Sequence, residues 1–196
     1  NLGYNINSLI AGLGVGGIAI AFALQNILSD IFSSLSIFFY KPFRVGDFIA
    51  LGEHKGTVQK IGIKTTRLKS LQGEELVISN NELTKSRLQN YGVMEERRVA
   101  FNINIDQGTP ILKLKKIPEM IKQIIETQAK TRLERVHFTE INQDHFIYSI
   151  VYFVLSKEYL DYVETQQAIN LAIVEKLGKE KIKLSHPAQT IYLKKN

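Results

Sequence analysis

The chain has 196 residues, of which 44% are hydrophobic and 22% charged, and its formal net charge is +6. That length suffices for one large domain or for two or three small ones. Cysteine is absent from the sequence, which excludes disulfide frameworks, thiolate zinc sites and cysteine nucleophiles.

The first forty residues are strongly apolar and the remainder are not. We therefore expect a membrane-proximal start followed by soluble domains. The sequence shows neither an initiator methionine nor a signal-peptide pattern at its start. We expect it to begin inside a longer protein, with further hydrophobic helices upstream.

The most informative stretch is the apolar segment Leu9–Leu24, in which glycine or alanine recurs about every third or fourth residue. Placed on a helix at ~100° per residue, this segment has a front face of apolar side chains and two smooth flanks. The front face contains Ala11, Val15, Ile18 and Phe22. The flanks contain Gly12, Gly16, Ala19 and Ala23 on one side, and Gly14, Gly17 and Ala21 on the other.

Two smooth flanks predict that the helix packs against a copy of itself on each side, because small residues let helix backbones approach closely. If that contact repeats by rotation, the copies close into a ring and the front face lines its central hole. Two alternatives stay open. The stretch is short enough to be a buried core helix. Gly12–Gly17 also fits the dinucleotide-binding motif G-x-G-x-x-G with Asp30 as ribose partner, although neither a convincing strand nor a βαβ unit accompanies it.

After Leu24 the helix becomes amphipathic, and this change predicts a bend near Asn26 into a helix that lies at the membrane interface. Its polar residues are Gln25, Asn26, Ser29, Asp30, Ser33, Ser34 and Ser36. The alternative is a straight helix with a polar lower face. Aromatic residues followed by basic ones are typical of a membrane edge on the cytoplasmic side. We predict Tyr40, Lys41 and Arg44 as the anchor there, and Pro42 as the end of the helix.

From Val45 the hydrophobic period changes to two, which predicts a small, twisted, barrel-like β domain. We expect strands over Asp47–Leu51, Lys55–Ile63, Thr65–Leu71 and Leu76–Ser79, and an exit marked by Asn80, Asn81 and Gly92. Such a domain, similar to the Sm barrel, also suits RNA binding. A membrane-anchored RNA-binding module is therefore the main alternative function, although the domain shows no aromatic stacking platform.

From Arg98 the order β-α-β-β-α indicates an α+β (ferredoxin-like) domain. We expect Thr109 to cap a helical turn, Pro118 to begin a helix, and Gly178 to end the last helix. The last helix is expected to present one apolar side, made of Leu160, Val163, Leu171, Val174 and Leu177. A final extended piece, Lys183–Lys195, has no local partner strand and is expected to join a sheet elsewhere, including one between subunits.

Catalytic patterns are not evident. The four histidines are scattered without metal-ligand spacing, and the neighbours Asp144 and His145 are read as part of a hairpin. We therefore expect a protein that is not an enzyme, with no metal site and no cofactor.

Five segments in this order resemble the small-conductance mechanosensitive channel (MscS-like) family: GGIAIAFALQNILSD, YKPFRVGDFI, GTV, VISNNEL and HPAQTIYL. The resemblance covers essentially the whole chain. It implies a homo-heptamer in the bacterial inner membrane, with a pore-lining helix (1–40), a β domain (41–97), an α+β domain (98–182) and a C-terminal strand (183–196) in an intersubunit barrel. It further implies a multi-pass protein with these later domains in the cytoplasm.

The resemblance also implies a function and a site. Such channels open under membrane tension and release ions and small solutes on hypo-osmotic shock, so the implied partners are other copies of the chain and the bilayer, without nucleic acid or cofactor. The family's two constriction positions fall on Ile18 and Phe22, and its helix break falls at Asn26. Relatives often carry leucine at the constriction and some a glycine at the break. Ser79 stands where a proline is common.

Overall fold

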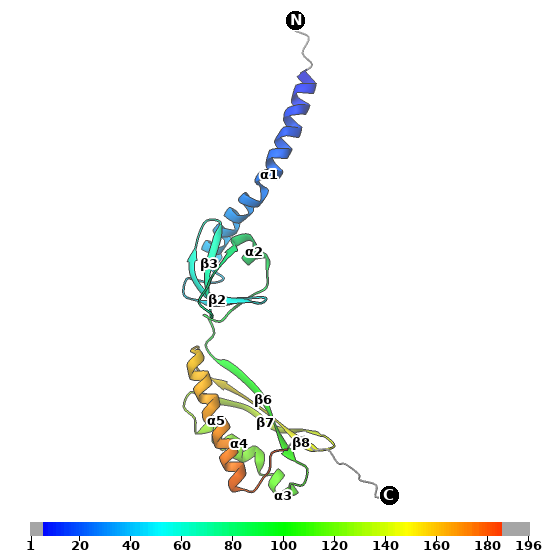
Figure 1. Ribbon diagram of the computed structural model, residues 1–196, viewed down its shortest axis with the longest axis vertical. Helices are drawn as coiled ribbons and strands as arrows, with labels where there is room; N and C mark the ends of the chain where they lie inside the picture. Colours follow the sequence, from blue (N-terminus) through cyan, green and yellow to red (C-terminus); the bar gives the residue numbers. More distant parts are fainter. Residues whose placement is uncertain (1–5, 186–196) are drawn as a thin grey trace, which may run out of the picture. The chain divides into compact units, whose positions relative to one another are not determined.

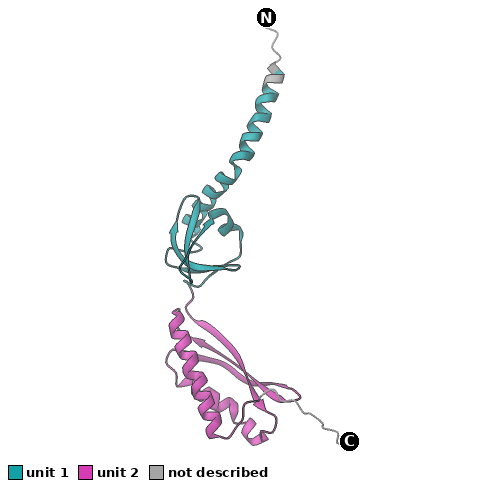
Figure 2. Cartoon of the chain, in the orientation of Figure 1, with its two compact units in different colours: residues 1–93 teal, residues 94–196 magenta. Residues whose placement is uncertain are grey.

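The computed structural model describes residues 6–185, and the chain divides into two compact units, residues 1–93 and residues 94–196 (Figure 2). The first unit combines a long helix with a small β domain. The second is an α+β domain.

In the first unit, one long helix leads into a five-stranded antiparallel sheet with the order β4-β3-β2-β1-β5, and a short helix joins β4 to β5 (Figure 1). The elements are α1 (Ile6–Tyr40), β1 (Phe48–Leu51), β2 (His54–Ile61), β3 (Thr65–Ser70), β4 (Glu75–Ser79), α2 (Asn80–Lys85) and β5 (Leu88–Asn90). The four strands predicted from the sequence are all present with slightly different bounds. The helix α2 is an addition, and it begins where Ser79 accepts a hydrogen bond from the backbone N–H of Glu82 (3.1 Å). Ser79 is therefore a helix cap.

The core of the first unit includes the end of the long helix. Ile37 of α1 and Phe43 just after it are buried against side chains of the sheet and of α2. The sheet and α2 contribute Ile49, Leu51, Val58, Leu68, Ile78 and Leu83. The last turns of α1 thus fold as part of the β domain, whereas the rest of the helix does not.

The second unit is a three-stranded antiparallel sheet with the order β6-β8-β7, accompanied by three helices (Figure 1). Its elements are β6 (Arg97–Asp106), α3 (Ile111–Leu114), α4 (Ile117–Glu126), β7 (Thr131–Ile141), β8 (His145–Val154) and α5 (Tyr159–Lys179). Because β8 lies between β6 and β7, this is the split βαβ arrangement of ferredoxin-like folds, as predicted. Leu184 pairs with Ile105 on the free edge of β6. The rest of the expected terminal strand lies outside the described residues.

Three local expectations for the second unit were wrong. The cap of α3 is Pro110, without a side-chain hydrogen bond, and not Thr109. Helix α5 continues through Gly178 to Lys179, and the left-handed backbone (φ 53°) occurs at Lys181 instead. The buried side of α5 is Ile169, Ile173 and Leu177. Of the five residues predicted for that side only Leu177 is buried, because apolar residues occur on both sides of α5 and helix α4 and strand β8 pack against the other side.

Two buried tyrosines of β8 give this unit a pH dependence. Burial raises the pKa of Tyr152 to about 12, with a smaller contribution from Tyr162, and burial also raises the pKa of Tyr148. The Tyr152 hydroxyl donates to Oε1 of Gln166 (2.8 Å). Because the folded protein holds the phenol proton more tightly than the unfolded chain does, this stabilisation is complete below about pH 10 and is lost as the pH rises towards 12.

We expect Tyr152→Phe to cost about 1 kcal/mol at pH 7, the usual net value of one hydrogen bond. Above pH 10 the variant should lose stability less steeply than the wild type, since it has no phenol to ionise at this position. Thermal unfolding of both proteins at pH 7, 9 and 11 checks this. Parallel pH profiles would contradict it.

Candidate functional site

The front face of α1 is open along its length. Val15, Ile18 and Phe22 follow one another at helical spacing, and Ile18 and Phe22 are 58% and 70% exposed. Ala11 is exposed on the same face. No other residue of the described chain covers these side chains, so the predicted pore face is available to another molecule.

Both flanks of α1 are equally open. A Cβ atom built on Gly12, Gly14, Gly16 or Gly17 meets no atom within 4 Å in the part of the chain that the structure describes. The flank alanines, Ala19, Ala21 and Ala23, are exposed. Nothing within the described chain therefore requires small residues here, and their role as packing flanks stays a prediction.

The apolar part of α1 spans Ile10–Tyr40 with a mean hydropathy of 1.7. Among the described residues, α1 is the one helix that is long and apolar enough to cross a membrane. At about 1.5 Å per residue its 31 residues exceed the ~30 Å of bilayer hydrocarbon. None of the most apolar window is buried inside the folded chain. The helix is therefore not buried within the described chain, and an apolar surface of this size needs lipid or protein to cover it.

The lower half of α1 is held by hydrogen bonds to α2, which we call the α1–α2 contact. Asp30 is only 5% exposed, and its Oδ1 accepts from the backbone N–H of Asn81 (3.1 Å). Ser29 donates to Oδ1 of Asn81 (2.9 Å), and Thr84 donates to the hydroxyl of Ser33 (3.0 Å). The polar stripe predicted to face the membrane interface therefore faces the β domain in part.

The position of Asp30 also tests the hypothesis that Gly12–Gly17 bind a dinucleotide. Its carboxylate is buried in the α1–α2 contact, and Gly12–Gly17 lie inside a continuous helix, not in a strand-to-helix turn. A phosphate-binding loop needs that turn. The dinucleotide-binding hypothesis is therefore wrong.

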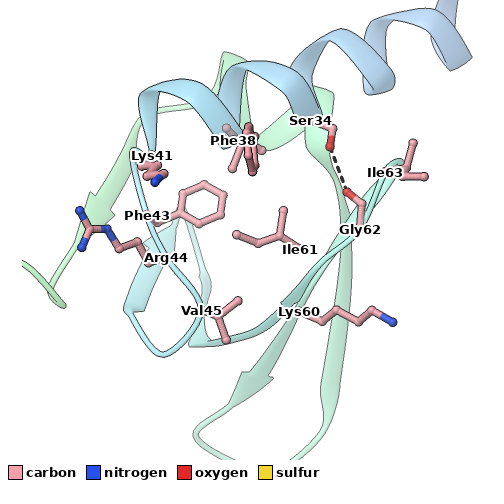
Figure 3. Close-up of a pocket in the computed structure, with 11 residues that line it drawn as sticks. Ser34, Phe38, Lys41, Phe43, Arg44, Val45, Lys60, Ile61, Gly62 and Ile63 are labelled. Atoms are coloured by element: carbon pink, nitrogen blue, oxygen red, sulfur yellow. Dashed lines mark hydrogen bonds between the residues drawn. The ribbon is translucent and has the colours of Figure 1, made fainter.

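A hollow of about 870 Å³ lies between the end of α1 and strand β2 (Figure 3). Phe43 and Ile61 lie in its middle, and the side chains of Arg44 and Lys60 extend outwards in different directions. On one wall Ser34 donates to the carbonyl of Gly62 (3.3 Å). The hollow is thus apolar inside and basic at its rim.

The predicted membrane-edge residues stand on the surface of this region. Tyr40 is 84% exposed, and Lys41 and Arg44 are exposed as well. Lys41 has a left-handed backbone (φ 47°), and its N–H donates to the carbonyl of Ile37 (2.9 Å), which closes the helix. The Arg44 N–H donates to Oδ2 of Asp47 (2.8 Å). Their role at a membrane stays a prediction.

Helix α1 continues without interruption through Asn26, whose side chain is exposed. The predicted hinge at this residue stays a prediction, since a continuous helix is compatible with bending during function. The described residues contain no group of three potential metal ligands. His145 contacts Oδ1 of Asp144 through Nδ1 (2.6 Å) beside the β7–β8 turn, where a hairpin was predicted.

The α1–α2 contact was not predicted from the sequence. Its residues were recognised as polar, but their partners lie about fifty positions away. One local signal was present, because Ser79 and Glu82 have the Ser-x-x-Glu spacing that begins a helix. That spacing predicts α2, and with it a surface against which α1 can pack.

Known families and structures match this arrangement from end to end. Family models match residues 1–25 (mechanosensitive ion channel, transmembrane helices 2/3), residues 26–93 (mechanosensitive ion channel, β-domain) and residues 99–184 (mechanosensitive ion channel MscS, C-terminal). The chain belongs to the MscS-like family of mechanosensitive ion channels.

Two relatives from Methanocaldococcus jannaschii align with the whole chain. The small-conductance mechanosensitive channel MscMJ is 36% identical and the large-conductance mechanosensitive channel MscMJLR is 32% identical. The chain spans 56% of the length of each. Solved MscS-like structures agree with the fold. Arabidopsis thaliana MSL1 has a TM-score of 0.84 at 25% identity (93% of this chain, 67% of that one), and closed-state Helicobacter pylori MscS has 0.81 at 24% (100% and 76%).

Proposed function

We propose that this chain is the pore-forming and cytoplasmic part of a mechanosensitive ion channel. Seven copies assemble in a bacterial inner membrane, each contributing further membrane helices upstream of Asn1. The channel opens under membrane tension and releases ions and small osmolytes on hypo-osmotic shock. The observation that carries the proposal is α1, an exposed apolar helix with two open, small-residue flanks and a polar lower end fixed to a folded domain.

In this mechanism the closed pore is narrowed by two stacked rings of side chains from Ile18 and Phe22. A narrow apolar neck excludes ions by dewetting even when it is not sterically sealed. Tension favours the conformation with the larger area in the membrane plane. The helices then tilt or rotate, their smooth flanks slide past one another, and the rings withdraw from the pore axis.

The direct test is single-channel recording of the full-length protein, reconstituted in liposomes and exposed to suction. We expect unitary currents whose open probability rises with tension, and silent patches from empty liposomes. Tension-independent currents, or none from folded and inserted protein, would refute the proposal.

The flanks give a second, independent expectation. Ala19→Val should shift the activation curve to higher tension, because the two added methyl groups obstruct sliding between neighbouring helices. Ile20→Val is the control: it places the same valine side chain on the side of α1 away from both flanks and the front face, where Ile20 is exposed. We expect its midpoint to stay near that of the wild type. An activation curve for Ala19→Val that superimposes on the wild-type curve would contradict the role of the flanks.

A further inference from the structure

One side chain in the β domain joins the turn after α1 to the segment that follows β5. The amide nitrogen of Asn90 donates to the carbonyl of Pro42 (3.0 Å) and to Oδ2 of Asp47 (2.9 Å). Its amide oxygen accepts from the backbone N–H of Gly92 (2.8 Å). Asn90 thus uses both ends of its amide group, two bonds on one side and one on the other.

Asp47 completes the group, which we call the Asn90 cluster (Pro42, Arg44, Asp47, Asn90 and Gly92). The same Oδ2 that binds Asn90 accepts from the backbone N–H of Arg44 (2.8 Å). The backbone of Gly92 lies against the side chain of Asp47, and a Cβ atom on Gly92 would be 2.4 Å from Oδ1 of Asp47. Only glycine allows this approach, so the two segments are tightly joined.

The segments joined in this way connect to different parts of the protein. Pro42 is the second residue after α1, and the turn from Arg44 to Asp47 follows it. Gly92 follows β5, and one residue later the first unit ends. In the second unit the chain is held again almost at once, since the Arg132 guanidinium binds both carboxylate oxygens of Glu96 (2.7 and 2.8 Å).

Arg97, which follows Glu96, also attaches this part of the chain to the second unit. The guanidinium of Arg97 lies over the rings of Tyr159 and Tyr162, 5.6 and 5.2 Å from their centres. Between the two attached segments only residues 93–95 remain. Along the backbone, the end of α1 and the second unit are separated by the whole β domain, whereas the hydrogen bonds of Asn90 connect them by a short path.

Strand pairing does not require this amide. The backbone of β5 already pairs with β1, with Asn90 opposite Ile49, and the rings of Phe48 and Tyr91 contact each other. The side chain of Asn90 adds something different, because it reaches past the strand to the turn that ends α1.

We propose that Asn90 is a positioning residue for gating: its amide makes the end of α1 and the start of the segment leading to the second unit move together. This inference rests on the proposed function. When α1 tilts, the turn after Pro42 moves with it, and the Asn90 cluster pulls Gly92 and the following chain along. That linkage adds a load to opening, so removing it should let the pore open at lower tension.

The test compares full-length wild type with Asn90→Ala and Asn90→Asp in liposome patches. Alanine removes all three hydrogen bonds. Aspartate keeps the size but replaces the donor with a carboxylate that faces Asp47. At one intermediate tension we expect both variants to raise the ratio of open to closed channels by roughly 2- to 30-fold, the range found for residues that couple sites. Unitary conductance should be unchanged, since the pore-lining residues are intact.

Two controls separate coupling from stability. Gln89→Ala removes an exposed amide from the same strand, and Ile78→Ala weakens the core of the same domain from β4, at the opposite end of the sheet order. Melting temperature and oligomer size are measured for every variant. We expect Gln89→Ala to behave as wild type, and Ile78→Ala to melt earlier but open at the wild-type tension.

The outcomes are distinguishable. If the Asn90 variants melt earlier yet open at the wild-type tension, or if Ile78→Ala shifts opening as far as they do, Asn90 is only structural and the inference is overturned. If the wild type itself does not open under tension, the proposed function fails, and the inference with it. A shift confined to the two Asn90 variants supports the inference.

Discussion

Phe22→Ser should give a channel that conducts at zero tension and opens further at lower tension than the wild type. Phe22 is the bulkier of the two front-face residues proposed to form the constriction, and serine removes a large apolar surface while adding a hydroxyl group. Burying a phenylalanine is worth about 1.5–3 kcal/mol per side chain, and a ring contains several copies. We expect the open-to-closed ratio to rise by more than about tenfold, which corresponds to only 1.4 kcal/mol.

The control for this substitution is Ile20→Ser, which removes a comparable apolar surface from the side of α1 opposite the front face. Ile20 is exposed in the single chain, as Phe22 is, so both substitutions spare the folded core. We expect a small change in opening tension and no leak from Ile20→Ser. Equal leaks from the two variants, or a silent Phe22→Ser channel with the wild-type threshold, would remove Phe22 from the constriction.

Asn80→Ala should produce a large loss of stability in the β domain. Asn80 is completely buried, accepts from the hydroxyl of Thr66 (2.8 Å) and donates to the carbonyl of Gly62 (2.8 Å). Alanine leaves buried polar groups with fewer partners, at a cost of about 2–3 kcal/mol. For a unit of this size that corresponds to a melting temperature lower by about 8–24 °C.

Thermal unfolding of the purified full-length protein checks this expectation, with Asn102→Ala as control. Asn102 is exposed on β6 in the other unit, so its substitution should change the melting temperature by less than about 2 °C. Because Ser34 of α1 donates to the same Gly62 carbonyl, Asn80 also orients the loop that α1 touches. Melting behaviour that is the same for both variants would show that this buried network contributes little.

The β domain could be predicted because its signals are local. Alternating side chains and turn residues such as Gly52 and Gly73 define four of the five strands within a few residues. Helix α5 shows the limit of such signals. Its sequence offers apolar residues on two sides, and only the packing of α4 and the sheet decides that Ile169 is buried while Leu171 is exposed.

The candidate site divides in the same way. Which residues of α1 share a face follows from helical spacing alone, and the structure leaves Ile18, Phe22 and the flanks open as that interpretation requires. The contacts of Asp30 and Asn90 did not follow, since their partners lie 51 and 43 residues away and polar side chains do not reveal their partners. What fills the open faces depends on other chains and on lipid, which a single sequence specifies only through resemblance.

The left-handed backbone of Lys41 has a further consequence for the end of α1. Helices commonly end on glycine in the left-handed conformation, because a side chain there is disfavoured by roughly 1 kcal/mol or more. This chain accepts that penalty and thereby sets an ammonium group at the negative end of a long helix dipole, directly before a proline. A glycine in its place would relax the backbone and remove this positive charge. The end of α1 thus carries a lysine where a glycine would be less strained, directly after the apolar helix.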